Sequence, residues 1–119
     1  DISLVEISGL ESSTYIDKTT NPTSIGTSSS DPIKITSQTD KVFTVDSNQN
    51  GPITLLEENK KKFCLVRDNM NEVVVWNPWC ENEEISDFSP KDGYKNMICV
   101  EAGALKGWIE LRPGETWEG

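Results

Sequence analysis

The sequence contains no histidine, and it has no long apolar run. Without histidine, these residues alone can complete neither a Ser-His-Asp nor a Cys-His catalytic site, nor a histidine metal site. Any proton transfer by this chain must therefore depend on carboxylates, lysine, tyrosine or cysteine. A helix needs about 20 consecutive apolar residues to span a membrane, and no stretch approaches that length. We expect no membrane as partner.

Basic residues are also scarce. Eleven Lys and Arg stand against twenty Asp and Glu, which gives a formal net charge of -9. Proteins that bind nucleic acid or anionic membranes need a basic surface, so we expect no nucleic-acid partner. A phosphorylated substrate stays possible, because it needs only a few local cations.

Cysteine is present in an odd number, as Cys64, Cys80 and Cys99, and no pair has the CxxC spacing. This pattern favours buried, reduced thiols and a cytoplasmic location. We expect no metal site, because the chain has neither histidine nor the usual ligand spacing.

With 119 residues, 34% of them hydrophobic, the chain can build one domain with a modest core. Apolar runs separated by turn-forming residues recur at roughly the 8–12-residue spacing of all-β folds. The sequence therefore predicts an all-β, antiparallel architecture. Residues 19–31 are predicted to form an exposed loop, and residues 80–88 are the one possible helix. The predicted strands are 2–7, 32–35, 41–45, 53–56, 61–66, 72–76, 96–101, 107–111 and 115–118.

The run 94–101 is the most informative stretch, because an apolar strand rises to the single carboxylate of Glu101. Both faces of this strand are mostly apolar, so we expect it to be sandwiched, with Glu101 at its edge. A carboxylate that loses hydration becomes a stronger base. The alternative is a structural carboxylate paired with Lys95 or Lys106, and the residues leave both interpretations open.

Two other segments carry candidate binding residues. The segment 73–79, Val-Val-Val-Trp-Asn-Pro-Trp, reads most simply as a core strand, but Trp76 and Asn77 could also line a sugar-sized cleft. Asp40 precedes an apolar strand, where an Asp usually caps a turn. Its alternative role is to accept hydrogen bonds from substrate hydroxyls.

Together, four segments resemble the glucose-6-phosphate 1-epimerases, the hexose-6-phosphate mutarotase branch of the aldose 1-epimerase superfamily. These segments are 73–79, 87–88, 94–101 (Tyr-Lys-Asn-Met-Ile-Cys-Val-Glu) and 112–119 (Arg-Pro-Gly-Glu-Thr-Trp-Glu-Gly). Segments 5–10, 15–18 and 39–43 follow the family's order, so the resemblance covers essentially the whole chain. It implies a galactose-mutarotase-like antiparallel super-sandwich, of which residues 1–119 would be the C-terminal portion.

The resemblance also implies an activity, the cofactor-free interconversion of the α and β anomers of a hexose 6-phosphate. In this family a glutamate removes the proton of the anomeric hydroxyl, and Glu101 matches that glutamate. Asp40 matches the acid that binds sugar hydroxyls, and Trp76 and Asn77 would belong to the cleft wall. The family's acid histidine and its phosphate-binding arginines precede a segment similar to the start of this chain. The resemblance therefore implies that the isolated chain is inactive. As a separate expectation, the full-length enzyme is a monomer.

Two other functions fit the same sequence. One is a non-catalytic carbohydrate-binding β-sandwich of the same fold, which would bind a sugar without accelerating anomer exchange. The other is a structural or interaction domain without a sugar site. A saturable effect of sugar on tryptophan fluorescence would distinguish the first from the second.

Overall fold

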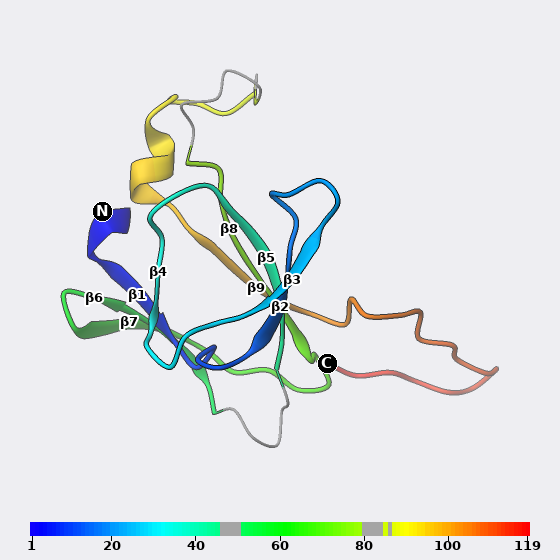
Figure 1. Ribbon diagram of the computed structural model, residues 1–119. Helices are drawn as coiled ribbons and strands as arrows, with labels where there is room; N and C mark the ends of the chain where they lie inside the picture. Colours follow the sequence, from blue (N-terminus) through cyan, green and yellow to red (C-terminus); the bar gives the residue numbers. More distant parts are fainter. Residues whose placement is uncertain (46–50, 80–84, 86) are drawn as a thin grey trace.

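The computed structural model describes residues 1–45, 51–79, 85 and 87–119, and these residues form two antiparallel sheets (Figure 1). The all-β prediction is confirmed. In the first sheet the order is β4 (Ile33–Lys34), β1 (Val5–Ser8), β6 (Ile53–Glu57) and β7 (Lys60–Leu65). In the second sheet the order is β3 (Ser24–Thr27), β2 (Thr14–Asp17), β5 (Thr39–Thr44), β8 (Glu72–Asn77) and β9 (Cys99–Gly103).

The valine-rich β8 lies inside the second sheet, with β5 on one side and β9 on the other. Branched valines suit a pleated strand, because they pack against neighbours on both sides. Val73 and Val75 are fully buried, whereas Val74 and Trp76, which point the opposite way, are only partly buried. This alternation shows which face of the second sheet meets the first sheet.

The core lies between the two sheets. Phe43, near the end of β5, is almost fully buried, and its ring centroid lies 5.3 Å from that of Tyr15 on β2. The other buried apolar side chains come from both sheets and from the loops that join them, so one core holds the layers together. They are Ile2, Ile7, Leu10, Ile35, Val45, Ile53, Val73 and Val75.

The hairpin that joins β6 to β7 turns through Glu58 and Asn59, whose φ angles are 51° and 62°. Two consecutive positive φ angles are typical of the type I′ turn that connects twisted strands. It places the lysine run 60–62 on exposed β7, where Lys62 pairs with Glu57 at 3.2 Å. Lysines on an edge strand discourage unwanted pairing with other chains.

The sequence misjudged several elements. Residues 24–27 form β3 inside the stretch predicted to be a loop, and β2 was not predicted. The predicted strand 2–7 begins with a short 3-10 helix, η1 (Ile2–Leu4), and a second one, η2 (Gly93–Asn96), precedes β9. Most of the helix considered at 80–88 lies outside the described residues. Within those residues, no helix has the length and apolar character needed to cross a membrane.

The predicted strands at 107–111 and 115–118 are wrong, because residues 104–119 have no strand structure. They form an arm that extends from the end of β9 and returns to the body (Figure 1). The Leu105 N–H donates to the buried Glu72 carboxylate at 2.8 Å, and the Asn69 amide donates to the Glu118 carbonyl at 2.9 Å. The apolar pattern was present, but a strand also needs a neighbour for its backbone groups.

Candidate functional site

The strand register brings three of the four predicted site residues onto one face of the second sheet. Asp40 on β5 lies opposite Trp76 on β8, and Trp76 lies opposite Cys99 on β9. Glu101, two residues after Cys99 on β9, lies opposite Val74 on β8. Directly paired residues point to the same side of a sheet. Since the intervening Val75 points into the core, this shared face points away from the first sheet.

Asp40 and Glu101 lie on the same face but do not contact each other. Asp40 and Glu101 are separated by two strand spacings and by two residues along the strands. With about 4.8 Å between strands and about 3.4 Å per residue, their Cα atoms lie about 12 Å apart. Trp76 and Val74 occupy the sheet between them. At this separation the two carboxylates cannot hydrogen-bond to each other directly.

Glu101 is exposed, so the expected partial burial of its carboxylate is not present in this chain. Neither Lys95 nor Lys106 lies within ion-pair distance of it, and no other described residue does either. The structural ion pair considered as its alternative role is therefore absent among the described residues. Glu101 is a carboxylate free to meet a ligand.

Cys99 lies beside this carboxylate, two residues earlier on the same face. Burial raises the pKa of the Cys99 thiol, and the negative charge of Glu101 and its hydrogen bonding raise it further. The thiol therefore stays protonated near neutral pH. The prediction of buried thiols is wrong for Cys64, which is exposed on β7. No group of three or more Cys, Asp or Glu residues that could hold a metal ion lies within the described part of the chain.

Asp40 lies within β5 and not in the turn that precedes it. Its side chain is 29% exposed, and its carboxylate lies 3.8 Å from the Lys18 ammonium group. The main chains are joined as well, since the Lys18 N–H donates to the Asp40 carbonyl at 2.8 Å. A turn-capping role does not fit this placement. The backbone of Asp40 is therefore held in place by hydrogen bonds, while its side chain stays partly accessible to solvent.

The surface beside these residues is apolar. Val42 lies opposite Val74, and both are partly buried on the shared face. The same row continues through Ile16, 44% exposed, to Ile25, 78% exposed. A row of exposed apolar side chains on one sheet face marks a surface suited to contact with a ligand or another element. The alternation of residues in segments 40–42 and 74–76 indicated such a face in the sequence. Which residues of the two strands lie opposite each other could not be read from the sequence.

Asn77, the fourth predicted site residue, points the other way and is fully buried. Its amide nitrogen donates to the carbonyls of Tyr94 at 2.9 Å and Met97 at 2.8 Å. Its carbonyl oxygen accepts from the Trp79 N–H at 2.8 Å. These three bonds occupy the amide, so Asn77 holds the turn before β9 in place. The geometry makes it a structural clamp behind the shared face.

Comparison with known proteins gives a consistent result over the entire chain. The family model described as "Aldose 1-epimerase" matches residues 1–119. A curated protein from Cenchrus ciliaris, named "Putative glucose-6-phosphate 1-epimerase", is 36% identical over 121 aligned residues. The alignment covers 100% of this chain and 35% of that relative, so the chain spans about a third of the relative's length.

Proposed function

Since this chain belongs to the aldose 1-epimerase family, we propose that it carries part of the active site of a hexose-6-phosphate mutarotase. The reaction would interconvert the α and β anomers of a sugar such as glucose 6-phosphate. The observation that supports this most is the shared face, on which Asp40, Trp76 and Glu101 lie together. The fold is accordingly part of a galactose-mutarotase-like sandwich.

In this proposal Glu101 is the general base. Its carboxylate removes the proton from the anomeric hydroxyl, while an acid protonates the ring oxygen and the C1–ring oxygen bond breaks. The open-chain aldehyde then rotates about the C1–C2 bond, and the ring closes on the other face as both protons return. A positioned general acid or base typically contributes about 10²–10⁴-fold to such a rate. Glu101 has no ion-pair partner among the described residues, and its exposed carboxylate is accessible to a sugar hydroxyl.

Asp40 and Trp76 would hold the sugar. Asp40 would accept hydrogen bonds from sugar hydroxyls, and its distance from Glu101 suits a ligand lying between the two acids. The Trp76 indole offers an apolar surface for the C–H face of the ring. We assign Asn77 a positioning role, because all of its amide bonds go to the protein. It would fix the turn from which the strand of Glu101 begins.

The acid that protonates the ring oxygen would come from a histidine outside this chain, which itself contains none. The phosphate-binding residues would also lie outside it, as the family resemblance implies. The proposed enzyme needs no cofactor and acts as a monomer in the cytoplasm. The isolated chain would be inactive. A non-catalytic carbohydrate-binding sandwich remains the second candidate, supported by the same apolar face and its acids.

The test uses a hybrid chain, in which residues 1–119 replace the matching part of the Cenchrus ciliaris relative. Exchange between the anomers of glucose 6-phosphate is measured by NMR magnetisation transfer. We expect the hybrid chain to accelerate exchange and this chain alone to leave it at the spontaneous rate. Asp40→Asn in the hybrid chain should raise KM more than it lowers kcat. Saturable quenching of tryptophan fluorescence without any acceleration would favour the non-catalytic candidate instead.

A further inference from the structure

Lys18 lies directly after β2, at the end of the shared face that carries Asp40 and Trp76. In the register of β2 and β5, Asp17 is paired with Lys41, so the next residues along, Lys18 and Asp40, lie opposite each other. Asp40 is in turn opposite Trp76. Directly opposed residues point to the same side of a sheet. Lys18 therefore extends the row of site residues by one strand.

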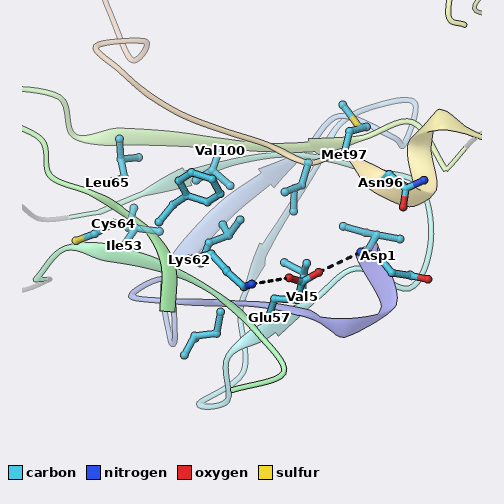
Figure 2. A pocket seen from close by; sticks show the side chains of 15 residues that line it. Asp1, Val5, Ile53, Glu57, Lys62, Cys64, Leu65, Asn96, Met97 and Val100 are labelled. Carbon is cyan, nitrogen blue, oxygen red and sulfur yellow. Dashed lines mark hydrogen bonds and ion pairs between the residues drawn. The ribbon is translucent and has the colours of Figure 1, made fainter. Parts of the chain in front are cut away.

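The ion pair between Lys18 and Asp40 is the only one among the described residues that includes a residue of the shared face. The first sheet has ion pairs of its own, in which Glu57 meets both Lys62 and the N-terminal ammonium group (Figure 2). On the shared face, Asp40 has a charged neighbour, whereas Glu101 has none within the described part of the chain. The two acids of this face are therefore set up differently.

The backbone that carries Lys18 is held on both sides. Its N–H donates to the Asp40 carbonyl at 2.8 Å. Just beyond it, the Thr19 N–H donates to the Asp17 carboxylate at 2.9 Å, and the Thr19 hydroxyl donates to the same oxygen at 2.6 Å. The other Asp17 oxygen lies 3.8 Å from the Lys41 ammonium group. An Asp that binds the backbone two residues on fixes a turn. The end of β2 thus presents the Lys18 side chain from a constrained position.

The contact between the two side chains involves one oxygen of the Asp40 carboxylate. The Lys18 ammonium group lies 3.8 Å from Oδ1, and no ion pair among the described residues reaches Oδ2. At this distance charge attraction joins the groups, and not a short hydrogen bond. An ionised carboxylate has about four lone-pair sites, so acceptor capacity remains for other donors. Lys18 can therefore orient the Asp40 carboxylate without occupying it.

We propose that Lys18 is a positioning residue of the sugar site and acts through Asp40. Its charge keeps Oδ1 of Asp40 turned toward the end of β2, which leaves Oδ2 directed to the sugar hydroxyls before a substrate binds. A side chain that is already ordered loses less conformational freedom on binding. The inference rests on the proposed role of Asp40 in sugar binding.

A double-mutant cycle in the hybrid chain tests this inference. Lys18→Met removes the charge and keeps an unbranched apolar stem, and it is combined with Asp40→Asn. KM and kcat for anomer exchange of glucose 6-phosphate are measured for both single variants and the double variant. Kd from tryptophan fluorescence gives a second measurement that does not require catalysis. Lys34→Met is the matched control, because it removes a similarly exposed ion pair with Glu6, at 2.9 Å, on the first sheet.

We expect Lys18→Met to raise KM and Kd by about two- to fivefold and to change kcat by less than about twofold, the range that an exposed ion pair allows. Lys18→Arg should restore KM, because it restores the charge. Lys34→Met should leave KM and kcat unchanged. In the Asp40→Asn background, Lys18→Met should have no further effect, since a residue that acts through another is not additive with it.

An unchanged KM and Kd in Lys18→Met would overturn the inference. An equal effect of Lys18→Met with and without the Asp40 carboxylate would also overturn it, because Lys18 would then act independently of Asp40. Both results require a hybrid chain that binds the sugar, so they leave the proposed function intact. A folded hybrid chain that neither binds the sugar nor accelerates exchange would contradict the proposed function, and the role of Lys18 would fail with it.

Discussion

The buried amide of Asn77 gives the most quantitative prediction. Replacing it with alanine removes two hydrogen bonds to the carbonyls of Tyr94 and Met97 and one from the Trp79 N–H. Each hydrogen bond contributes about 1 kcal/mol net, so Asn77→Ala should lower the free energy of unfolding by about 3 kcal/mol. That is a large share of the roughly 5–15 kcal/mol of a typical domain.

Urea denaturation of this chain, followed by tryptophan fluorescence, measures this loss. With a slope of about 1–3 kcal/mol per molar urea, the midpoint should fall by about 1–3 M. Asn71→Ala is the matched control, because Asn71 is exposed and its side chain makes no hydrogen bond among the described residues. Its effect should lie within about 0.5 kcal/mol of zero.

A nearly isosteric variant separates the hydrogen bonds from packing. Asn77→Asp keeps the size of the side chain and the acceptor for the Trp79 N–H, but it loses both donors to the carbonyls. We expect it to be at least as destabilising as Asn77→Ala, because it also buries an unpaired polar group near two carbonyl oxygens. If either variant of Asn77 changed stability no more than Asn71→Ala does, the clamp interpretation would be refuted.

Two further predictions concern titrating groups. The charge of Glu101 helps to raise the pKa of the Cys99 thiol, so Glu101→Gln should lower that pKa. Alkylation of Cys99 at pH 8 should then be faster, with Cys64 as the internal reference. An unchanged alkylation rate of Cys99 would argue against the contact between Cys99 and Glu101. The hydrogen bond from the Thr19 hydroxyl lowers the pKa of Asp17 below its usual value of 3.8. A carboxyl with a lowered folded-state pKa stabilises the fold above its unfolded pKa and loses that effect as the pH falls through the folded pKa. The stability advantage of the wild type over Asp17→Asn should therefore be constant at neutral pH and shrink below about pH 3.8, in urea titrations at several pH values. An advantage that grows on acidification would contradict this assignment.

The sequence predicted the fold class well, because alternation and turn residues report local geometry. The valine-rich segment that became β8 and the apolar run that became β6 were both found in this way. The strand β3 was missed, because its segment is rich in Ser and Thr with Gly26 at its centre. It exists because β2 supplies a partner along four residue pairs. Residues 107–111 show the converse, since an apolar pattern without a partner strand stayed irregular.

The candidate site was only partly predictable. The chemistry of Glu101 and Asp40 could be inferred from the family resemblance, but their placement on one face depends on the register of three strands. One residue of slip in β8 would have moved Trp76 to the inner face and Asn77 to the outer one. The burial of Glu101 could not be inferred from the run 96–101, because burial depends on what covers the strand.

The most direct test of the account is the rate of anomer exchange in the hybrid chain carrying Glu101→Gln. NMR magnetisation transfer on glucose 6-phosphate gives the rate, and Glu110→Gln, at an exposed position on the arm, is the matched control. We predict that Glu101→Gln lowers the catalysed rate by about 10²–10⁴-fold while the control leaves it unchanged, since a general base contributes about that much. Near-normal exchange in a folded Glu101→Gln protein would contradict the assignment of Glu101 as the base.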